Sequence, residues 1–116
     1  MLKNDDLIYF RSSMSNRIKY FASTSLGSYS QEELINTFRS EGFSFKAPDT
    51  LQLIISRSFY FTNRLNKYNL EKRLEFLNLK TDFILYDVNN YVSCFALKFK
   101  DVLDIVDRYV IDSYNF

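Results

Sequence analysis

The chain has 116 residues, of which 47% are hydrophobic and 25% charged, and its net charge is +1; these values are typical of a single globular domain. It has no histidine, two glycines and one cysteine, which excludes histidine-based catalysis, a zinc site made by this chain alone and glycine-rich phosphate loops. We therefore predict no catalytic residue, no metal site and no cofactor, and expect that the protein is not an enzyme.

The N-terminal segment is predicted to be a helix over residues 5–22, followed by a loop over 23–30. The prediction depends on apolar residues that recur at steps of three and four and so form one stripe along a helix. These residues are Leu7, Phe10, Met14, Ile18 and Phe21.

A second helix is predicted over residues 31–41. Ser30 followed by Glu33 forms a capping box, in which the serine side chain and the glutamate satisfy the first backbone N–H groups. Gly42 can take the left-handed conformation that ends many helices.

The middle of the chain is predicted to form two more helices. Residues 49–58 favour a helix that begins near Pro48, although the alternation of Leu51, Leu53 and Ile55 is also typical of a strand. Asn69 can cap a further helix over 70–78.

The segment 83–97 allows two interpretations. Apolar residues at steps of three and four continue a helical stripe through it, but Phe83–Tyr86 and Tyr91–Leu97 also resemble the two strands of a hairpin around Asn89 and Asn90. Residues 100–113 are predicted to be helical in both cases. The predicted fold is thus mainly α, a single domain over residues 1–116 with about five helices, and it becomes α+β if 83–97 is a hairpin.

The distribution of charge indicates a binding surface near the C-terminal end. Residues 1–80 hold twelve Lys or Arg and eight Asp or Glu, whereas 81–116 hold three basic residues and six aspartates. Because complementary charge speeds the capture of a partner, we predict a protein-binding surface on the last helix. Its residues are Asp101, Asp104, Asp107, Asp112 and Tyr114.

The amino-acid composition adds an indication of origin. Residues with AT-rich codons are abundant, and only six residues are Gly, Ala or Pro. These features favour a small regulator from a phage or mobile element, an inhibitor or immunity protein that masks a macromolecular target such as a nucleic-acid-processing protein.

The alternative function is a helix-turn-helix transcriptional regulator that binds DNA through residues 31–58. In this interpretation the second helix presents polar and basic side chains to base edges and phosphates. The candidate contacts are Lys46, Thr50, Gln52, Arg57 and Arg64.

The remaining expectations concern location and assembly. The single cysteine, Cys94, suits a reducing compartment and is expected to be buried and inert. The sequence has no signal peptide and no apolar run long enough for a membrane helix, so we expect a cytoplasmic protein. The sequence is also compatible with a homodimer.

Overall fold

The computed structural model describes residues 2–12, 18–24, 27–43, 50–59, 65–81 and 83–114, which form five strands and four helices. The strands are β1 (Leu7–Arg11), β2 (Lys19–Thr24), β3 (Gly27–Tyr29), β4 (Phe83–Tyr86) and β5 (Val92–Lys98). The helices are α1 (Gln31–Ser40), α2 (Thr50–Phe59), α3 (Lys67–Leu77) and α4 (Phe99–Tyr114). The prediction of a mainly α fold is therefore wrong, and the chain folds as α+β.

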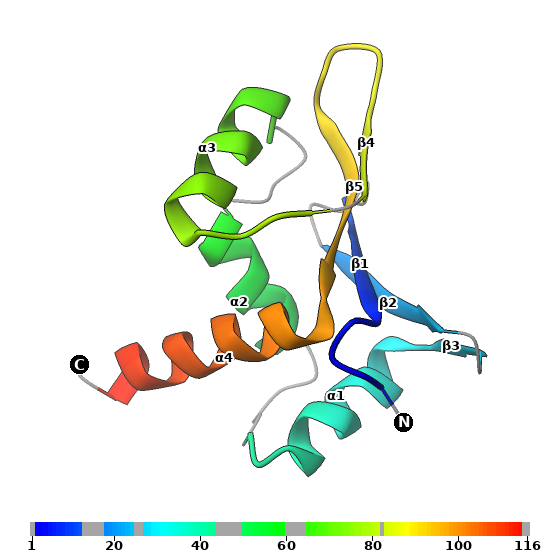
Figure 1. Cartoon of the computed structure of the whole chain (residues 1–116), viewed down its shortest axis with the longest axis vertical. Helices are drawn as coiled ribbons and strands as arrows, with labels where there is room; N and C mark the ends of the chain where they lie inside the picture. Colours follow the sequence, from blue (N-terminus) through cyan, green and yellow to red (C-terminus); the bar gives the residue numbers. More distant parts are fainter. Residues whose placement is uncertain are drawn as a thin grey trace.

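The five strands form one antiparallel sheet in the order β3-β2-β1-β5-β4 (Figure 1). β1, β2 and β3 follow one another as a meander, and the three helices α1 to α3 come next in the chain. The hairpin β4–β5 then returns and places β5 beside β1. The central strand β1 therefore joins the two ends of the sequence.

The prediction of a helix over 5–22 is wrong because this segment supplies β1 and β2. The side chains of Ile8 and Phe10 in β1 alternate with more exposed neighbours, and so do Tyr20 and Ala22 in β2, which is the period of a strand. Leu7 and Phe21, two members of the expected helical stripe, lie on the opposite face of the sheet from Phe10. Residues 23–30, expected as a loop, contain β3 and the end of β2.

The predicted helix over 31–41 is confirmed as α1, with Ser30 as its N-terminal cap. The backbone N–H of Glu33 donates to Ser30 Oγ at 3.3 Å, and Ser30 Oγ also lies 3.2 Å from Glu33 Oε1. Gly42 follows the helix with a φ of +99°, in the left-handed region.

The other three helices lie close to their expected positions. α2 confirms the helix over 49–58, and the strand interpretation of this segment is wrong. α3 begins earlier than predicted because Asn66, and not Asn69, is its N-terminal cap: Asn66 Oδ1 accepts a bond of 2.9 Å from the N–H of Asn69. α4 confirms the helix over 100–113.

Residues 83–97 form the predicted hairpin, and the helical interpretation of this segment is wrong. The turn is built on Asp87, whose Oδ1 accepts from the N–H groups of Asn89 at 2.8 Å and Tyr91 at 3.0 Å. Asn90 takes a φ of +65°, a conformation that asparagine tolerates.

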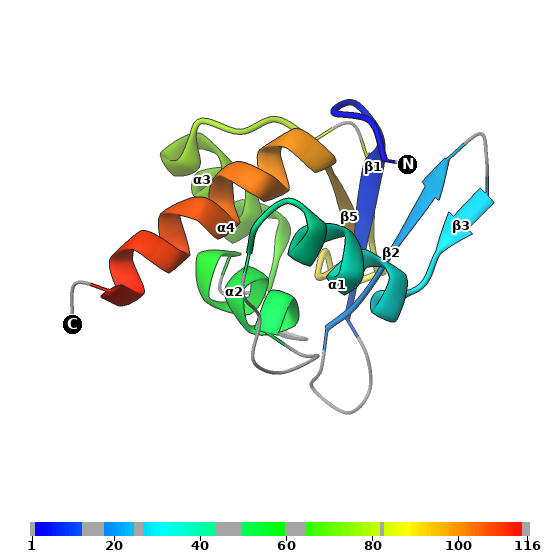
Figure 2. The ribbon, with the colours of Figure 1, turned by 90° about the horizontal axis from the view of Figure 1, so that it is seen from below.

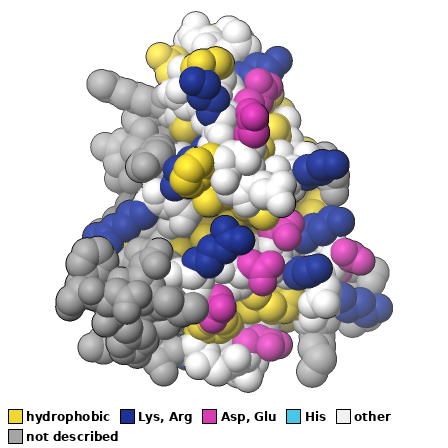
Figure 3. Space-filling view, turned by 60° about the vertical axis from the view of Figure 1, so that its left-hand side comes forward, with side chains coloured by type: hydrophobic (Ala, Val, Ile, Leu, Met, Phe, Trp, Pro, Cys, Tyr) yellow, Lys and Arg dark blue, Asp and Glu magenta, His cyan; other side chains and the backbone are white. Residues whose placement is uncertain are grey.

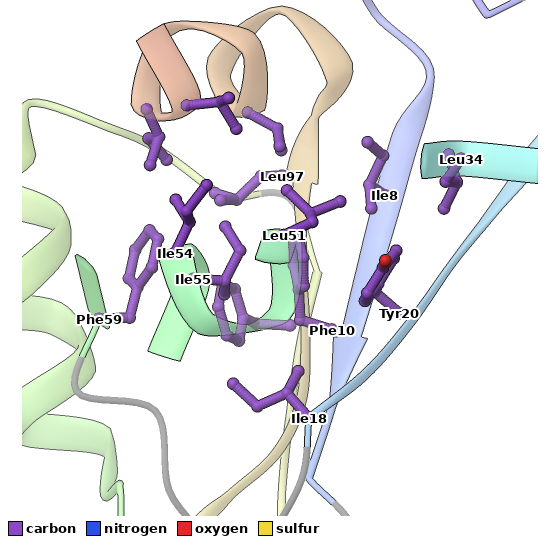
Figure 4. Packing of buried hydrophobic residues seen from close by; sticks show 14 of the residues in the cluster. Ile8, Phe10, Ile18, Tyr20, Leu34, Leu51, Ile54, Ile55, Phe59 and Leu97 are labelled. Carbon is purple, nitrogen blue, oxygen red and sulfur yellow. The ribbon is translucent and has the colours of Figure 1, made fainter. Parts of the chain in front are cut away.

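The hydrophobic core lies between one face of the sheet and the helices (Figures 1 and 2). Ile8 and Phe10 from β1 and Tyr20 from β2 point toward the helical layer, where Leu51 and Ile55 of α2 meet them (Figure 4). None of the helices in the described part of the chain covers the other face of the sheet.

Candidate nucleic-acid interface

The predicted acidic surface lies on α4 as far as the structure describes it. Asp104 and Asp107 are exposed and Asp101 is half-buried, on the side of α4 away from the buried Val102 and Val106. α4 also contains positions 112 and 114, but the side chains of Asp112 and Tyr114 lie outside the described residues. A partner for this surface stays a prediction.

The helical side of the molecule does not carry a field of one sign. Figure 3 shows acidic and basic side chains interspersed over the face it presents. α3, on this side, carries Lys67, Lys72 and Arg73 together with Glu71 and Glu75. The charge asymmetry between the two parts of the sequence is therefore diluted once the chain is folded.

The structure describes the side chains of two of the five residues proposed for helix-turn-helix binding, Gln52 and Arg57, both on α2. Gln52 is only 9% exposed, which counts against a contact between its side chain and a base edge. Arg57 is exposed on α2. Lys46 and Arg64 lie outside the described residues, as does the side chain of Thr50.

The position of α2 explains why Gln52 is buried. Leu51, Ile54, Ile55 and Phe59 of this helix are all 0% exposed, and the ring of Phe59 lies 5.1 Å from that of Phe95 in β5. A recognition helix must present most of one side to the groove of a duplex. α2 packs its Leu51, Ile54, Ile55 and Phe59 side into the core, and Leu53 and Arg57 are on its exposed side.

The sheet offers a different surface, the face that no described helix covers, which we call the open face. Strand pairing arranges its side chains in three parallel rows across the sheet. The middle row is Phe21, Tyr9, Ala96 and Phe83; the row on one side is Lys19, Arg11, Cys94 and Leu85; the row on the other side is Ser23, Leu7 and Lys98.

Three aromatic rings are in contact along the middle row. The rings of Tyr9 and Phe21 are stacked, with centroids 5.2 Å apart and planes 13° apart. The ring of Phe83 meets that of Tyr9 edge-on at 5.4 Å, although β5 separates their strands. This contact is possible because Ala96 lies between them in the register, and its small side chain is completely buried.

The rings are packed but still accessible. Tyr9 and Phe21 are half-buried and Phe83 is 39% exposed, whereas the aromatic residues on the helical face, such as Phe10, Tyr20 and Phe95, are at most 2% exposed. The middle row therefore presents ring edges and part of their faces to solvent. Single aromatic residues on a surface are ordinary, but a contiguous set often marks a binding site.

Basic side chains flank the aromatic row on both sides. Arg11 and Lys19 form part of one outer row, with the Arg11 guanidinium carbon 5.6 Å from the centroid of the Phe21 ring, and Lys98 belongs to the other. Lys98, the last residue of β5, also has its Nζ 3.7 Å from the carboxylate of Asp5, which lies just before β1. The five described strands themselves contain no Asp or Glu.

Cys94 lies on the open face next to Arg11, its partner in the register of β5 and β1. The thiol is buried, as expected, and this burial raises its pKa above the ordinary value, although the charge of Arg11 and a hydrogen bond from it act in the opposite direction. A cation beside the thiol was not expected from the sequence. The raised pKa keeps the thiol neutral near pH 7, which disfavours a role as a nucleophile.

Searches with the whole chain found no matching family model, curated protein or solved structure. Within the described ranges, no three Asp, Glu or Cys side chains come together as metal ligands. No helix in this part of the chain has the length and apolarity to cross a membrane. Since no related protein assigns a role to the open face, its function is inferred from the positions of its side chains.

Sequence reasoning missed the open face because it assigned residues 5–22 to a helix. Among the tyrosines, only Tyr114 is predicted from the sequence to be a contact; in the structure Tyr68 is 61% exposed and Tyr29 is half-buried. Tyr9 was not singled out. The alternation in the segment 7–11, with apolar Ile8 and Phe10 between Tyr9 and Arg11, was the pattern that could have revealed the face.

Proposed function

We propose that this protein is a non-catalytic nucleic-acid-binding protein that holds its ligand on the open face of the sheet. The observation that carries the proposal is the contiguous row of Phe21, Tyr9 and Phe83 between rows that contain Arg11, Lys19 and Lys98. Nucleic acids combine phosphate charge with planar rings, and proteins bind them with basic groups and aromatic side chains.

The absence of acidic residues from the described strands supports the same ligand. Carboxylates on the open face would repel phosphates, and Asp5, which pairs with Lys98, lies outside the strands, just before the start of β1. Because Arg11 and Lys19 are neighbours in the register of β1 and β2, they present two positive charges on one side of the rings. Such a pair can contact successive phosphates.

The test is the binding of a labelled mixed-sequence oligonucleotide, offered both as a single strand and as a duplex, measured by fluorescence anisotropy over a series of salt concentrations. We expect binding that weakens as salt rises, because the phosphate contacts release counterions. The double substitution Arg11→Gln with Lys19→Gln should weaken binding and lower the salt slope by about 1 to 2.

A matched control removes two positive charges from the helical layer. Lys72 of α3 and Lys100 of α4 are both exposed, so Lys72→Gln with Lys100→Gln makes the same change in net charge. This variant should bind nearly as well as the unmodified protein. Equal losses from the two double variants, or no binding of either form of the oligonucleotide, would refute the proposed function.

A further inference from the structure

We infer that the open face selects unpaired bases, so that the ligand is a single-stranded nucleic acid of which about three nucleotides cross the middle row. This inference rests on the proposed function and specifies its ligand. It follows from the shape of the face, the accessibility of its rings and the placement of its charges.

The shape of the face disfavours a duplex. The open face is one side of a five-stranded sheet, with no described helix or loop lifted from it to enter a groove (Figure 2). In a duplex the flat surfaces of the bases are stacked inside the helix, so aromatic rings of a sheet cannot reach them. In a single strand the bases can turn outward and pack on aromatic side chains.

The size of the row sets the number of bases. Phe21 is on β2 and Phe83 on β4, which are three strand positions apart in the sheet. At about 4.8 Å for each step between strands, the row spans about 14 Å. Sheets that bind single strands in this way stack two or three bases on their aromatic residues, which fits a row of this length.

The charges on the two outer rows suit a strand that crosses the sheet along the middle row. Arg11 and Lys19 lie together on one side of the rings, where they can contact the phosphates of a strand whose bases cover the middle row, whereas Lys98 on the other side is paired with Asp5. The guanidinium of Arg11 is close to the Phe21 ring and adds a planar cationic surface against which a base can stack.

The same charges argue against a second copy of this chain as the occupant. Apposing two open faces would bring Arg11, Lys19 and Lys98 of one copy close to the same cations of the other without any strand carboxylate to offset them. Like charges placed together at an interface are unfavourable. A ligand with negative charge and exposed planar rings matches both the cations of the outer rows and the aromatic rings of the middle row.

The experiment compares the affinities of a single-stranded decanucleotide and of the duplex of the same sequence, at one low salt concentration. Oligo(dT) and oligo(U) of the same length serve as further probes that distinguish DNA from RNA. We expect the single strand to bind at least about tenfold more tightly than the duplex, because each stacked base contributes a large part of the affinity. Tyrosine fluorescence should fall on binding, and this change should be smaller in Tyr9→Phe.

Variants test whether the rings of the middle row are the cause. Phe21→Ala and Phe83→Ala should each weaken single-strand binding by about tenfold, and Tyr9→Phe should bind nearly normally because it keeps the ring. The control is Phe76→Ala: Phe76 is 75% exposed on α3, and this substitution removes an exposed ring from the helical layer. Far-UV circular dichroism establishes that each variant is folded.

The outcomes separate this inference from the proposed function. Duplex binding equal to or stronger than single-strand binding, with sensitivity to Arg11→Gln and Lys19→Gln, would overturn the inference and leave nucleic-acid binding in place. Failure of every nucleic acid to bind would overturn both. Concentration-dependent dimers that disappear in Phe83→Ala, without binding of a single strand, would identify a second copy as the occupant and also overturn the inference.

Discussion

Phe10 and Phe21 provide a direct comparison between the two faces of the sheet. Both belong to the apolar stripe from which a helix over 5–22 was predicted, and such a helix would bury both on one side. In the structure Phe10 is completely buried, with its ring 5.5 Å from that of Phe95, whereas Phe21 is half-buried and stacked on Tyr9. Substituting each with alanine should therefore have very different consequences.

The expected costs follow from these surroundings. Phe10→Ala removes a fully buried ring and leaves a cavity, which should reduce the free energy of unfolding by about 3–5 kcal/mol. Phe21→Ala loses a stacked contact worth about 0.5–1.5 kcal/mol and some partial burial, so we expect a loss of about 1–2 kcal/mol. Because domains of this size are stable by only about 5–15 kcal/mol, the first variant should approach unfolding while the second stays folded.

Urea denaturation followed by far-UV circular dichroism measures both costs, since the chain has no tryptophan for fluorescence. The difference in stability should appear in the midpoint, with similar slopes for the two variants. Equal losses for Phe10→Ala and Phe21→Ala, or a larger loss for the second, would refute the assignment of the two residues to opposite faces.

Two further predictions concern the pH dependence of stability and the hairpin turn. Because burial raises the pKa of the Cys94 thiol, its contribution is complete below about pH 9, the ordinary thiol value, and is lost as the pH rises through the higher folded value. The urea midpoint should therefore fall more between about pH 8 and pH 10 in the unmodified protein than in Cys94→Ala, and equal falls would contradict this assignment. Asp87→Ala removes the acceptor for the N–H groups of Asn89 and Tyr91 and should cost about 1–2 kcal/mol, measured by thermal unfolding. Asp87→Asn keeps an oxygen at this position, so a loss as large as that of Asp87→Ala would argue against the turn.

The sequence predicted the helices best where a side chain caps them. Ser30 Oγ accepts from the backbone N–H of Glu33, only three residues further on, so the effect of this cap is local and visible in the sequence. The start of α3 was misplaced by three residues because Asn66 and Asn69 are both suitable caps, and only the folded chain decides between them.

The N-terminal strands could not be separated from a helix by spacing alone. Leu7, Phe10 and Phe21 fit a helical stripe, but Ile8 and Phe10 also fit a strand, and short apolar segments satisfy both patterns. The choice is made by partners far away in the sequence: Tyr9 pairs with Phe21 and also with Ala96. Such strand pairing overrides the local preference of this segment for a helix.

The candidate site depended on the same distant pairing. Phe83 and Tyr9 are separated by most of the chain, and no spacing rule brings them together. Their contact requires β5 between β1 and β4, with Ala96 at the register position that separates the rings. The acidic residues of α4, in contrast, are visible in the sequence because one helix carries them all.

The placement of β5 beside β1 has a consequence for the folding of this protein during its synthesis on the ribosome. Leu7 of β1 pairs with Lys98 of β5, so β1 gains its second neighbouring strand only after β2, β3, the helices α1 to α3 and β4 have been synthesised. Until then, the nascent meander lacks two of the five strands of the final sheet, and the apolar side chains of Phe10 and Tyr20 have no complete core in which to pack. Contacts between residues this far apart in the sequence slow folding. They therefore lengthen the period in which partly folded chains with exposed apolar surface can associate. Translation arrested after α3 should therefore yield an aggregation-prone fragment, which chaperones that bind exposed apolar segments would retain.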